Sequence, residues 1–354
     1  MNTWTQEEKS LLWLDSFPID PSGKWALVHA AGSAVELVKR FSSYGAHVSD
    51  EKLFAAMQET LKDGEYFLRL KSRLEAENIT PVFFGGVGYP KGWLTLPDAP
   101  LCLYAKGKVG LLEERKFAIV GSRRTTEGAR KLGAVIAKEL TGCFAVTTGS
   151  ADGGDEAALK GGLEGGKAIC LLAGGFGAIP KENLLLGEVE KHGLLLAACP
   201  YDTPVRVYSY EYRNKLLALM SEGVLVLGAA KKSGALITAK YAKEAGKAVF
   251  AIPYAPSVLA GEGCNALIKQ GAYLTESSAD IVEKYGYTAV EKKAVTLSET
   301  EEKVRELLVE LGETHVSELA KASGLPTFKL MTVLSSLEIK GVAVKLGGNR
   351  YAAV

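Results

Sequence analysis

The chain has 354 residues, of which 47% are hydrophobic and 23% are charged. This is the composition of an ordinary globular protein, so it excludes a mainly disordered chain, and the length indicates two or three domains. The 42 basic and 41 acidic side chains give a formal net charge of +1, so the overall charge gives no sign of nucleic-acid binding. Any anion site must come from the local placement of Arg, Lys and backbone N–H groups.

Cysteine usage and the N-terminal sequence bear on the cellular compartment. The five cysteines are widely separated and form no CxxC pair, so neither a disulfide framework nor a zinc site is expected, and a reducing cytoplasm is the natural location. The N-terminus has no basic segment followed by an apolar run, and no stretch approaches the roughly 18 apolar residues of a membrane span. We therefore expect a soluble cytoplasmic protein with no metal, no cofactor and no membrane partner.

The first predicted domain, residues 1–75, is helical. Apolar residues recur at helical spacing in SAVELVKRF and EKLFAAMQETL. HAAGSAVELVKRF predicts a helix-turn-helix corner with Gly32 in the turn and Ser33 as the N-cap of the second helix. Such a block could contact the DNA backbone, as SAM and helix-hairpin-helix modules do, but the residues favour a packing or interaction module.

The second predicted domain, residues 78–290, alternates short apolar strands with helical segments. FAIVG, FAVTTG, AICLLAGGF, GVLVLGAA and AVFAIP are typical of strands buried on both faces. The alternation predicts an α/β fold with a parallel sheet that is covered by helices. Ligands bind such sheets at the carboxyl ends of the strands, where this sequence places a series of glycines: Gly121, Gly149, Gly174 and Gly228.

The third predicted domain, residues 296–354, follows a linker within YTAVEKKAVTLSETEEK. The stretches EEKVRELLVEL, HVSELAKASG and TFKLMTVLSSLEIKG predict three helices, and VAVKLGGNRYAAV predicts a hairpin that turns at Gly347, Gly348 and Asn349. Three helices and a hairpin are typical of a winged helix. Eight Glu against five Lys and two Arg give this domain a net charge of −1, so contact with protein, including support of a dimer, is at least as well supported as DNA binding.

The stretch FAIVGSRRTTEGARKLG is the first of five that carry chemistry. Gly121 ends a strand, and the polar residues after it can donate to an anion at the start of the next helix: Ser122, Arg123, Arg124, Thr125 and Thr126. This concentration of donors favours a phosphate site over a plain turn with solvated arginines. Neither the G-x-G-x-x-G dinucleotide pattern nor a Walker A loop is present, so ATP hydrolysis has no support.

The second stretch, TTGSADGGDEAALKGGL, is rich in glycine, and Gly149 and Gly153 permit close approach of the backbone to a ligand. Asp155 is placed where a helix N-cap would stand. A catalytic interpretation would make Asp152 or Asp155 a general acid or base. No His, Cys or second carboxylate is placed nearby in the sequence to complete such a pair, so we favour Asp155 as a cap that holds the loop.

The third stretch, YSYEYRNKLLALMSEG, places Arg213, Asn214 and Lys215 at the start of an apolar helix, just after tyrosines that include Tyr210. Cations and flat rings suit a single nucleic-acid strand, because the cations follow the phosphates and the rings stack on the bases. The alternative is a helix start whose tyrosines pack into the domain. For a single tyrosine packing is favoured, whereas for the three polar residues the two interpretations are balanced.

The fourth and fifth stretches are polar turns at the same predicted edge. In AAKKSGALITAKYAKEAGKAVFAIP, Ser233 and Gly234 lead into a helix that contains Lys240. In GEGCNALIKQGA, Asn265 follows a glycine-rich approach. Either could be a loop without function, but their repetition along one sheet edge favours a shared ligand.

With these five stretches in order, the chain resembles the DNA-processing protein family DprA, also called Smf. The family pattern is a Gly-Ser-Arg loop, Ser-Gly-x-Ala-x-Gly-x-Asp, Arg-Asn-Arg, Ser-Gly-x-Leu-Ile-Thr-Ala and Gly-x-Asn-x-Leu-Ile-x-x-Gly-Ala. The matching positions here are residues 121–123, 148–155, 213–215, 233–239 and 263–272. The resemblance covers roughly residues 80–285, and the helical block and winged helix fit the family's flanks more loosely.

This resemblance implies an extended Rossmann-like domain that binds single-stranded DNA without catalysing a reaction. It also implies a recombination mediator that loads the RecA recombinase during DNA uptake and natural transformation, and that works as a homodimer. Carried over by position, the residues expected to bind DNA are Ser122, Arg123, Arg213, Asn214, Lys215, Ser233 and Gly234, with Asn265 as a weaker candidate.

Several positions depart from the family pattern. Thr148 replaces Ser, Asp152 stands where Arg is usual, Gly154 replaces Ile, Leu159 replaces His, and Lys215 replaces Arg. Asp152 would place an acid beside the phosphate path, so we expect weaker or altered DNA affinity, or a specialised paralogue.

Two other functions fit a Rossmann-like fold. One is a nucleotide-binding sensor. The other is an enzyme of the type that cleaves nucleoside monophosphates, a phosphoribohydrolase, which needs a Pro-Gly-Gly-x-Gly-Thr loop followed by a catalytic Glu. The corresponding stretch here, AAKKSGALITA, contains no Glu. Competition between a mononucleotide and an oligonucleotide would distinguish a sensor, and a mononucleotide hydrolysis assay would distinguish an enzyme.

Overall fold

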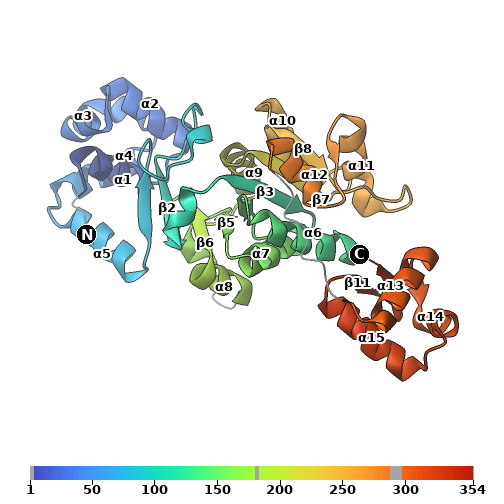
Figure 1. Cartoon of the computed structure of the whole chain (residues 1–354). Helices are drawn as coiled ribbons and strands as arrows, with labels where there is room; N and C mark the ends of the chain where they lie inside the picture. The colour runs from blue at the N-terminus through green and yellow to red at the C-terminus, as the bar shows by residue number, and fades with distance from the viewer. Residues whose placement is uncertain (1–3, 180–182, 288–296, 354) are drawn as a thin grey trace. The chain divides into compact units, whose positions relative to one another are not determined.

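A computed structural model describes residues 4–179, 183–287 and 297–353, which fall into two units, residues 1–288 and 289–354 (Figure 1). The expected linker lies largely within residues 288–296, outside the described residues. The division of the sequence into three domains stays a prediction.

The N-terminal block is helical, as the sequence predicts. In the described residues it contains α1 (Gln6–Asp15), α2 (Pro21–Ala31), α3 (Ala34–Lys39), α4 (Glu51–Lys62) and α5 (Tyr66–Ala76). The predicted corner is confirmed: Gly32 ends α2 with a φ of 85°, and the Ser33 side chain accepts a hydrogen bond from the Glu36 N–H at the start of α3. Glycine suits the left-handed conformation because it has no Cβ.

This block packs directly on the sheet. Trp13 is fully buried in a core that also contains Cys102 and Leu195 of the sheet. Polar contacts cross the same boundary: the Tyr104 hydroxyl donates to Asp15 Oδ2 at 2.7 Å, and Trp25 Nε1 donates to the carbonyl of Ala99 at 2.7 Å. The block and the sheet therefore share one apolar core within the first unit.

The described sheet of this unit has nine strands in the order β1-β2-β6-β5-β4-β3-β7-β8-β9. From β6 to β9 all neighbours are parallel, whereas β1 and β2 run antiparallel at one edge. The strands are β1 (Thr80–Phe83), β2 (Cys102–Gly107), β3 (Lys116–Gly121), β4 (Ala145–Thr148), β5 (Ala168–Leu172), β6 (Leu194–Ala197), β7 (Gly223–Gly228), β8 (Ala248–Ala251) and β9 (Tyr273–Leu274). The α/β parallel-sheet prediction is confirmed, although it named only β3, β4, β5, β7 and β8.

Helices cover both faces of the sheet (Figure 1). One face carries α6 (Glu127–Leu140), α7 (Gly154–Glu164) and α8 (Leu184–His192), and the other carries α9 (Val207–Met220) and α10 (Ala235–Glu244). Beyond them are α11 (Glu262–Lys269) and α12 (Ala279–Val282). The chain runs outward from β3 through β6 and then returns to β7, which pairs with the other side of β3. The carboxyl ends of β3 and β7 therefore flank the point where the strand order reverses, the usual ligand position in such sheets.

The second unit is a winged helix. Its described elements are α13 (Glu299–Leu311), β10 (Thr314–His315), α14 (Val316–Ser323), α15 (Thr327–Ile339), β11 (Ala343–Leu346) and β12 (Arg350–Ala353). Leu330, Leu334 and Leu337 of α15 are fully buried. The hairpin turns at Gly348 and Asn349, which have φ values of 69° and 56°. The predicted winged helix and its hairpin are confirmed.

Candidate nucleic-acid interface

Three loops meet at the carboxyl ends of the central strands. We call them together the ledge: residues 121–126 after β3, residues 149–153 after β4, and residues 229–234 after β7. The Ser122 N–H donates to the carbonyl of Gly228 at 2.8 Å, and the Gly154 N–H donates to the carbonyl of Ser122 at 3.3 Å. The loop after β3 is therefore tied to both of its neighbours.

The glycines of the ledge allow its loops to pack closely against one another. A Cβ added at Gly154 would overlap the Cα of Gly121. Gly153 has a φ of 86°, and a Cβ there would lie 2.6 Å from the carbonyl oxygen of Ser122. Close approach of a ligand was the expected use of this glycine run, whereas in the structure it packs two loops backbone against backbone.

Asp155 holds these loops in place from the first turn of α7. Its Oδ1 accepts from the Gly121 N–H at 3.1 Å, and its Oδ2 accepts from the Ala151 N–H at 3.4 Å. Burial raises the pKa of this carboxyl above its ordinary value, while the Arg213 charge and the two backbone donors oppose that rise. The expected loop-holding role agrees with these bonds, but the expected N-cap position is wrong, because Gly153 is the N-cap of α7.

The predicted phosphate-binding residues of the first loop divide into two groups. Arg123 and Arg124 are exposed and have no ion-pair partner among the described residues. The Ser122 hydroxyl is buried and is also without a hydrogen-bond partner in the described part of the chain. Thr125 and Thr126 are used internally: the Thr125 hydroxyl donates to the Ser122 carbonyl at 2.8 Å, and the Thr126 side chain caps α6. The two exposed guanidinium groups are therefore available to an anion, whereas the Ser122 hydroxyl is shielded from solvent.

The loop after β7 adds cations beside the point where the strand order reverses. Lys232 is exposed and has no ion-pair partner among the described residues, whereas Lys231 lies 3.5 Å from Glu262. Gly234 has open space around it, because the nearest atom to an added Cβ is 3.9 Å away. Ser233 and Gly234 stand at the N-terminus of α10, where the Ser233 hydroxyl accepts from the Ala235 N–H at 3.4 Å.

Two other predicted site residues lie outside the ledge. Lys240 is one and a half turns into α10, exposed, with its Nζ 3.8 Å from Glu244. Asn265 is engaged within the protein, since its Oδ1 accepts from the Tyr254 N–H at 3.0 Å and its Nδ2 donates to the Tyr254 carbonyl at 2.8 Å. Asn265 therefore braces the loop that follows β8.

The third stretch differs most from its predicted position. Helix α9 begins at Val207, so Arg213 lies in the middle of the helix, and the expectation of a helix start there is wrong. The Arg213 side chain is only 6% exposed, with its Nη1 3.8 Å from Asp155 Oδ2 and 3.4 Å from the Leu171 carbonyl. A Cβ on Gly149 would overlap this guanidinium. Arg213 therefore lies behind the ledge.

The other predicted site residues on α9 face different directions and make different contacts. Lys215 Nζ donates to both carboxylate oxygens of Asp98, at 2.7 and 2.8 Å. Asn214 Nδ2 donates to the Gly234 carbonyl at 3.2 Å and so joins α9 to the ledge. Tyr210 is 42% exposed and can offer its ring to solvent. Adjacent positions on a helix face different directions, which separates residues that are consecutive in the sequence.

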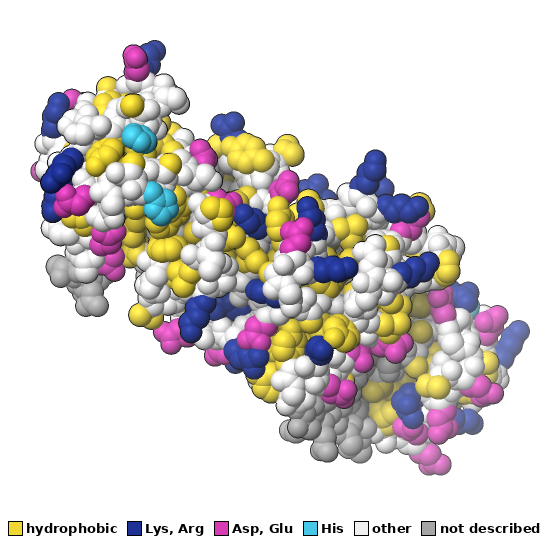
Figure 2. Space-filling model, turned by 90° about the horizontal axis from the view of Figure 1, so that it is seen from above, with side chains coloured by type: hydrophobic (Ala, Val, Ile, Leu, Met, Phe, Trp, Pro, Cys, Tyr) yellow, Lys and Arg dark blue, Asp and Glu magenta, His cyan; other side chains and the backbone are white. Residues whose placement is uncertain are grey.

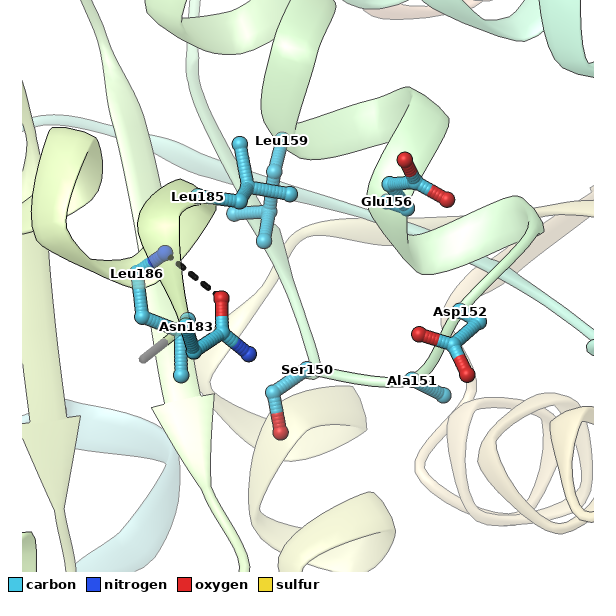
Figure 3. Close-up of a pocket in the computed structure, with 8 residues that line it drawn as sticks. All are labelled: Ser150, Ala151, Asp152, Glu156, Leu159, Asn183, Leu185 and Leu186. Atoms are coloured by element: carbon cyan, nitrogen blue, oxygen red, sulfur yellow. Dashed lines mark hydrogen bonds between the residues drawn. The ribbon is translucent and has the colours of Figure 1, made fainter. Parts of the chain in front are cut away.

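A small cavity of about 160 Å³ lies beside the loop after β4 (Figure 3). Leu159 and Leu185 meet at one end of it, and the Asp152 and Glu156 carboxylates stand toward the other. Asn183 Oδ1 accepts from the Leu186 N–H at 3.1 Å at its rim. No Lys or Arg lines the cavity in the described residues, so Asp152 and Leu159, both departures from the family pattern, leave it poorly suited to a phosphate.

Charge elsewhere is mixed. Figure 2 shows Lys and Arg side chains interspersed with Asp and Glu over the face that it presents. The part of the chain that the structure describes has no group of three or more His, Cys, Asp or Glu that could hold a metal ion, and none of its helices is long and apolar enough to cross a membrane. The unpaired arginines of the ledge are therefore a local feature and not part of a basic face.

Comparison with known proteins connects this geometry to a family. Residues 81–286 match the family model of DNA recombination-mediator protein A, and residues 292–354 match that of the sugar-specific transcriptional regulator TrmB. Protein Smf of Escherichia coli is 32% identical over 276 residues, which cover 73% of this chain and 74% of that protein.

Two solved structures share the fold. DNA processing protein A of Streptococcus pneumoniae superposes with a TM-score of 0.66 at 24% identity, covering 81% of this chain and 100% of that one. DNA processing protein A of Helicobacter pylori, whose structure is described for its single-stranded DNA binding mode, gives a TM-score of 0.53 at 26% identity. That match covers 58% of this chain and 95% of the other.

Proposed function

Because the chain belongs to the DNA recombination-mediator protein A family, we propose that it binds single-stranded DNA along the ledge without catalysing a reaction. The observation that carries this proposal is a set of unpaired donors where the strand order reverses. Arg123 and Arg124 project without carboxylate partners in the described residues, beside the unpartnered Ser122 hydroxyl. The relative from Helicobacter pylori, described as a single-stranded DNA binder, supports the same ligand.

The proposed mechanism is electrostatic capture on a preformed surface. Arg123 and Arg124 bind phosphate oxygens, Lys232 extends the basic surface across β7, and the open backbone at Gly234 admits the strand closely. Exposed Tyr210 lies one helical turn before Asn214, which bonds to Gly234 of the ledge, so its ring can stack on a base there. Because phosphate contacts release counterions, affinity should fall steeply as salt rises.

We further propose that the bound strand is delivered to the RecA recombinase during DNA uptake, and that the protein acts in the cytoplasm as a homodimer. These steps rest on the family and on the resemblance in sequence. The winged helix has a net charge of −1, so for that unit a protein contact is at least as well supported as DNA binding.

Fluorescence anisotropy with a labelled oligo-dT at two salt concentrations tests the proposal. We expect Arg123→Ala/Arg124→Ala to weaken binding at least thirtyfold and to reduce the salt slope by about two, because two phosphate contacts are lost. The matched control is Lys138→Ala/Lys191→Ala. It removes two exposed cations near the C-terminal ends of α6 and α8, which lead to the amino ends of β4 and β6.

Competitors distinguish the other functions. Excess AMP should not displace the oligonucleotide, and incubation with AMP should release no free base. Displacement by AMP would support a nucleotide sensor, and hydrolysis would support a phosphoribohydrolase. An absence of oligo-dT binding at low salt would contradict the DNA-binding proposal.

A further inference from the structure

A second cavity, much larger than the first, lies between the helical block and the carboxyl ends of β5 and β6. We call it the crevice; its volume is about 1080 Å³. One wall is formed by α1, the start of α2 and α5, and the other by residues 198–204 and one face of α9. Both walls belong to the first unit. The volume exceeds the 300–1,000 Å³ that is typical of small-molecule sites.

The acidic side chains that line the crevice in the described residues are already bonded. Each carboxylate contacts either a cation or a helix N-terminus: Asp15 with Lys24 at 2.8 Å, Asp98 with Lys215 at 2.7 Å, Asp202 with Arg73 at 2.7 Å, and Asp20 with the Gly23 N–H at 3.0 Å. Their negative charge is therefore largely compensated. Binding of an anion in the crevice would not meet an unpaired carboxylate from this set.

Two arginines lie on the crevice face of α9, and one of them, Arg213, has a carboxylate nearby, Asp155 Oδ2 at 3.8 Å from its Nη1. Arg206 precedes the first turn of the helix, is exposed, and has no carboxylate partner among the described residues. The Arg213 side chain is only 6% exposed, and its Nε has no hydrogen-bond partner within the described residues. Seven residues separate the two, so they share a face about 10 Å apart along the axis.

The N-terminus of α9 adds a third attraction for an anion. The N-cap residue Arg206 offers no side-chain acceptor to the first turn, the Ser209 hydroxyl accepts from the Arg206 N–H at 3.2 Å, and Arg206, Tyr208 and Ser209 all line the crevice. Free N–H groups and the positive end of the helix dipole favour negative charge there. The unpartnered Nε of buried Arg213 is an independent indication, because an arginine is rarely left buried without full pairing.

Flat and apolar side chains line the rest of both walls. Tyr208 is 69% exposed, Tyr212 is held by a hydrogen bond from its hydroxyl to the Asp98 carbonyl at 2.5 Å, and Tyr66 stands opposite on α5. Phe17 and Leu216 also line the crevice. A ligand that suits this wall has an aromatic ring, and a ligand that suits Arg206 and Arg213 has a phosphate.

We propose that the crevice is a second binding site, separate from the ledge, for a nucleoside phosphate. Arg206 and the N-terminus of α9 hold the phosphate, Tyr208 and Tyr212 contact the base, and Arg213 forms the charged inner end. The same chemistry can come from a free nucleotide or from a nucleotide of a bound strand. In the second case the site rests on the proposed DNA-binding function and extends its path.

Calorimetric titration of the full chain with a 5′-phosphorylated thymidine dinucleotide tests the site, with oligo-dT anisotropy measured in parallel. Arg206→Ala and Tyr208→Ala are the variants of choice, because both side chains are exposed and their loss should not unfold the protein. The Arg123→Ala/Arg124→Ala ledge variant and the Lys138→Ala/Lys191→Ala control complete the set.

A free-nucleotide site is supported if the dinucleotide binds, Arg206→Ala weakens it at least tenfold, and the ledge variant still binds it. A strand-borne site is supported if the dinucleotide does not bind alone, yet Arg206→Ala and Tyr208→Ala each weaken oligo-dT at least fivefold. The proposal is overturned if both variants leave every measured affinity within twofold of the original, or if neither probe binds at all. If those two variants change no affinity but the ledge variant binds oligo-dT more weakly, the crevice proposal fails and the DNA-binding proposal is still supported.

Discussion

Two runs of basic residues in this chain look alike in sequence and differ in structure. Arg123 and Arg124 lie on an exposed loop and have no ion-pair partner in the described residues. Arg213 is buried behind the ledge, and Lys215 is bonded to Asp98 on another side of the same helix. Both runs were expected to follow one phosphate path.

The difference shows that burial decides what a cation can do. An exposed arginine exchanges water for phosphate at little cost, whereas a buried one is already part of the fold and cannot be removed without leaving its partners uncompensated. The first run should therefore control DNA affinity, and the second should control stability. The substitutions below, in order of decreasing expected effect, test this distinction.

Gly149→Ala should have the largest effect. The new Cβ would overlap the Arg213 guanidinium and lie 2.5 Å from Asp155 Oδ2, so the buried ion pair must shift. We expect the free energy of unfolding to fall by about 3 kcal/mol, or the melting temperature by about 6–12 °C. Gly234→Ala is the control, since its Cβ meets nothing nearer than 3.9 Å. Equal thermal shifts for both variants would contradict the proposed packing.

Lys215→Ala should come next. It leaves Asp98, whose side chain is 23% exposed, without its cation, and we expect a loss of about 1–2 kcal/mol in denaturant unfolding. Oligo-dT affinity should stay within twofold. Adding Asp98→Asn should recover part of the stability, because the uncompensated charge is then removed. A loss of DNA affinity as large as that of the ledge variant would instead place Lys215 on the phosphate path.

Asp152→Lys should strengthen DNA binding by about tenfold and steepen the salt slope by about one, because it replaces an acid on the ledge with a phosphate contact. Anisotropy at two salt concentrations measures both quantities. Glu113→Lys is the control. It makes the same charge change in the exposed segment before the amino end of β3, whereas the ledge lies at the carboxyl ends of the strands. If both substitutions strengthen binding equally, the effect is one of net charge and the ledge is not the site.

Glu301→Gln should have the smallest effect and should act on the winged helix alone. Lys340, Ser336 and Ser298 donate to the Glu301 carboxylate and lower its pKa to about 2. A depressed pKa means that its stabilisation is complete above the ordinary value of 4.5 and is lost as pH falls toward 2. We expect the variant to melt a few degrees lower at pH 7, with a difference that shrinks between pH 4.5 and 2. Glu302→Gln, in an exposed pair with Arg305, should not show this pH dependence.

The central sheet could be predicted because its strands are continuous apolar runs that end in glycine. The strand β6 was missed because only Gly193 separates its LLLA run from α8, and a short apolar run beside a helix cannot be told from more helix. The start of α9 was misplaced because aromatic and β-branched residues from Val207 onward have weak helix propensity, and packing on the sheet overrides it.

The site was predictable where function depends on loop chemistry, and less so where it depends on tertiary contacts. Arg123 and Arg124 are exposed on the loop after β3, as their polar neighbours suggested. The burial of Arg213 could not be inferred, since arginine is rarely buried and its surroundings come from distant segments. Arg206 was missed, although its spacing of seven residues from Arg213 was a usable signal for a shared helix face.

The contact between Gly121 and Gly154 has a consequence for anyone who would exchange parts between relatives. The resemblance in sequence expects isoleucine at residue 154, yet here a side chain at that position would overlap the facing loop. Neither loop could therefore be replaced by that of a relative without a change in the other loop. If residues 148–155 were changed to the family pattern, the backbone of residues 121–126 would have to move away. The positions of Arg123 and Arg124 would change with it.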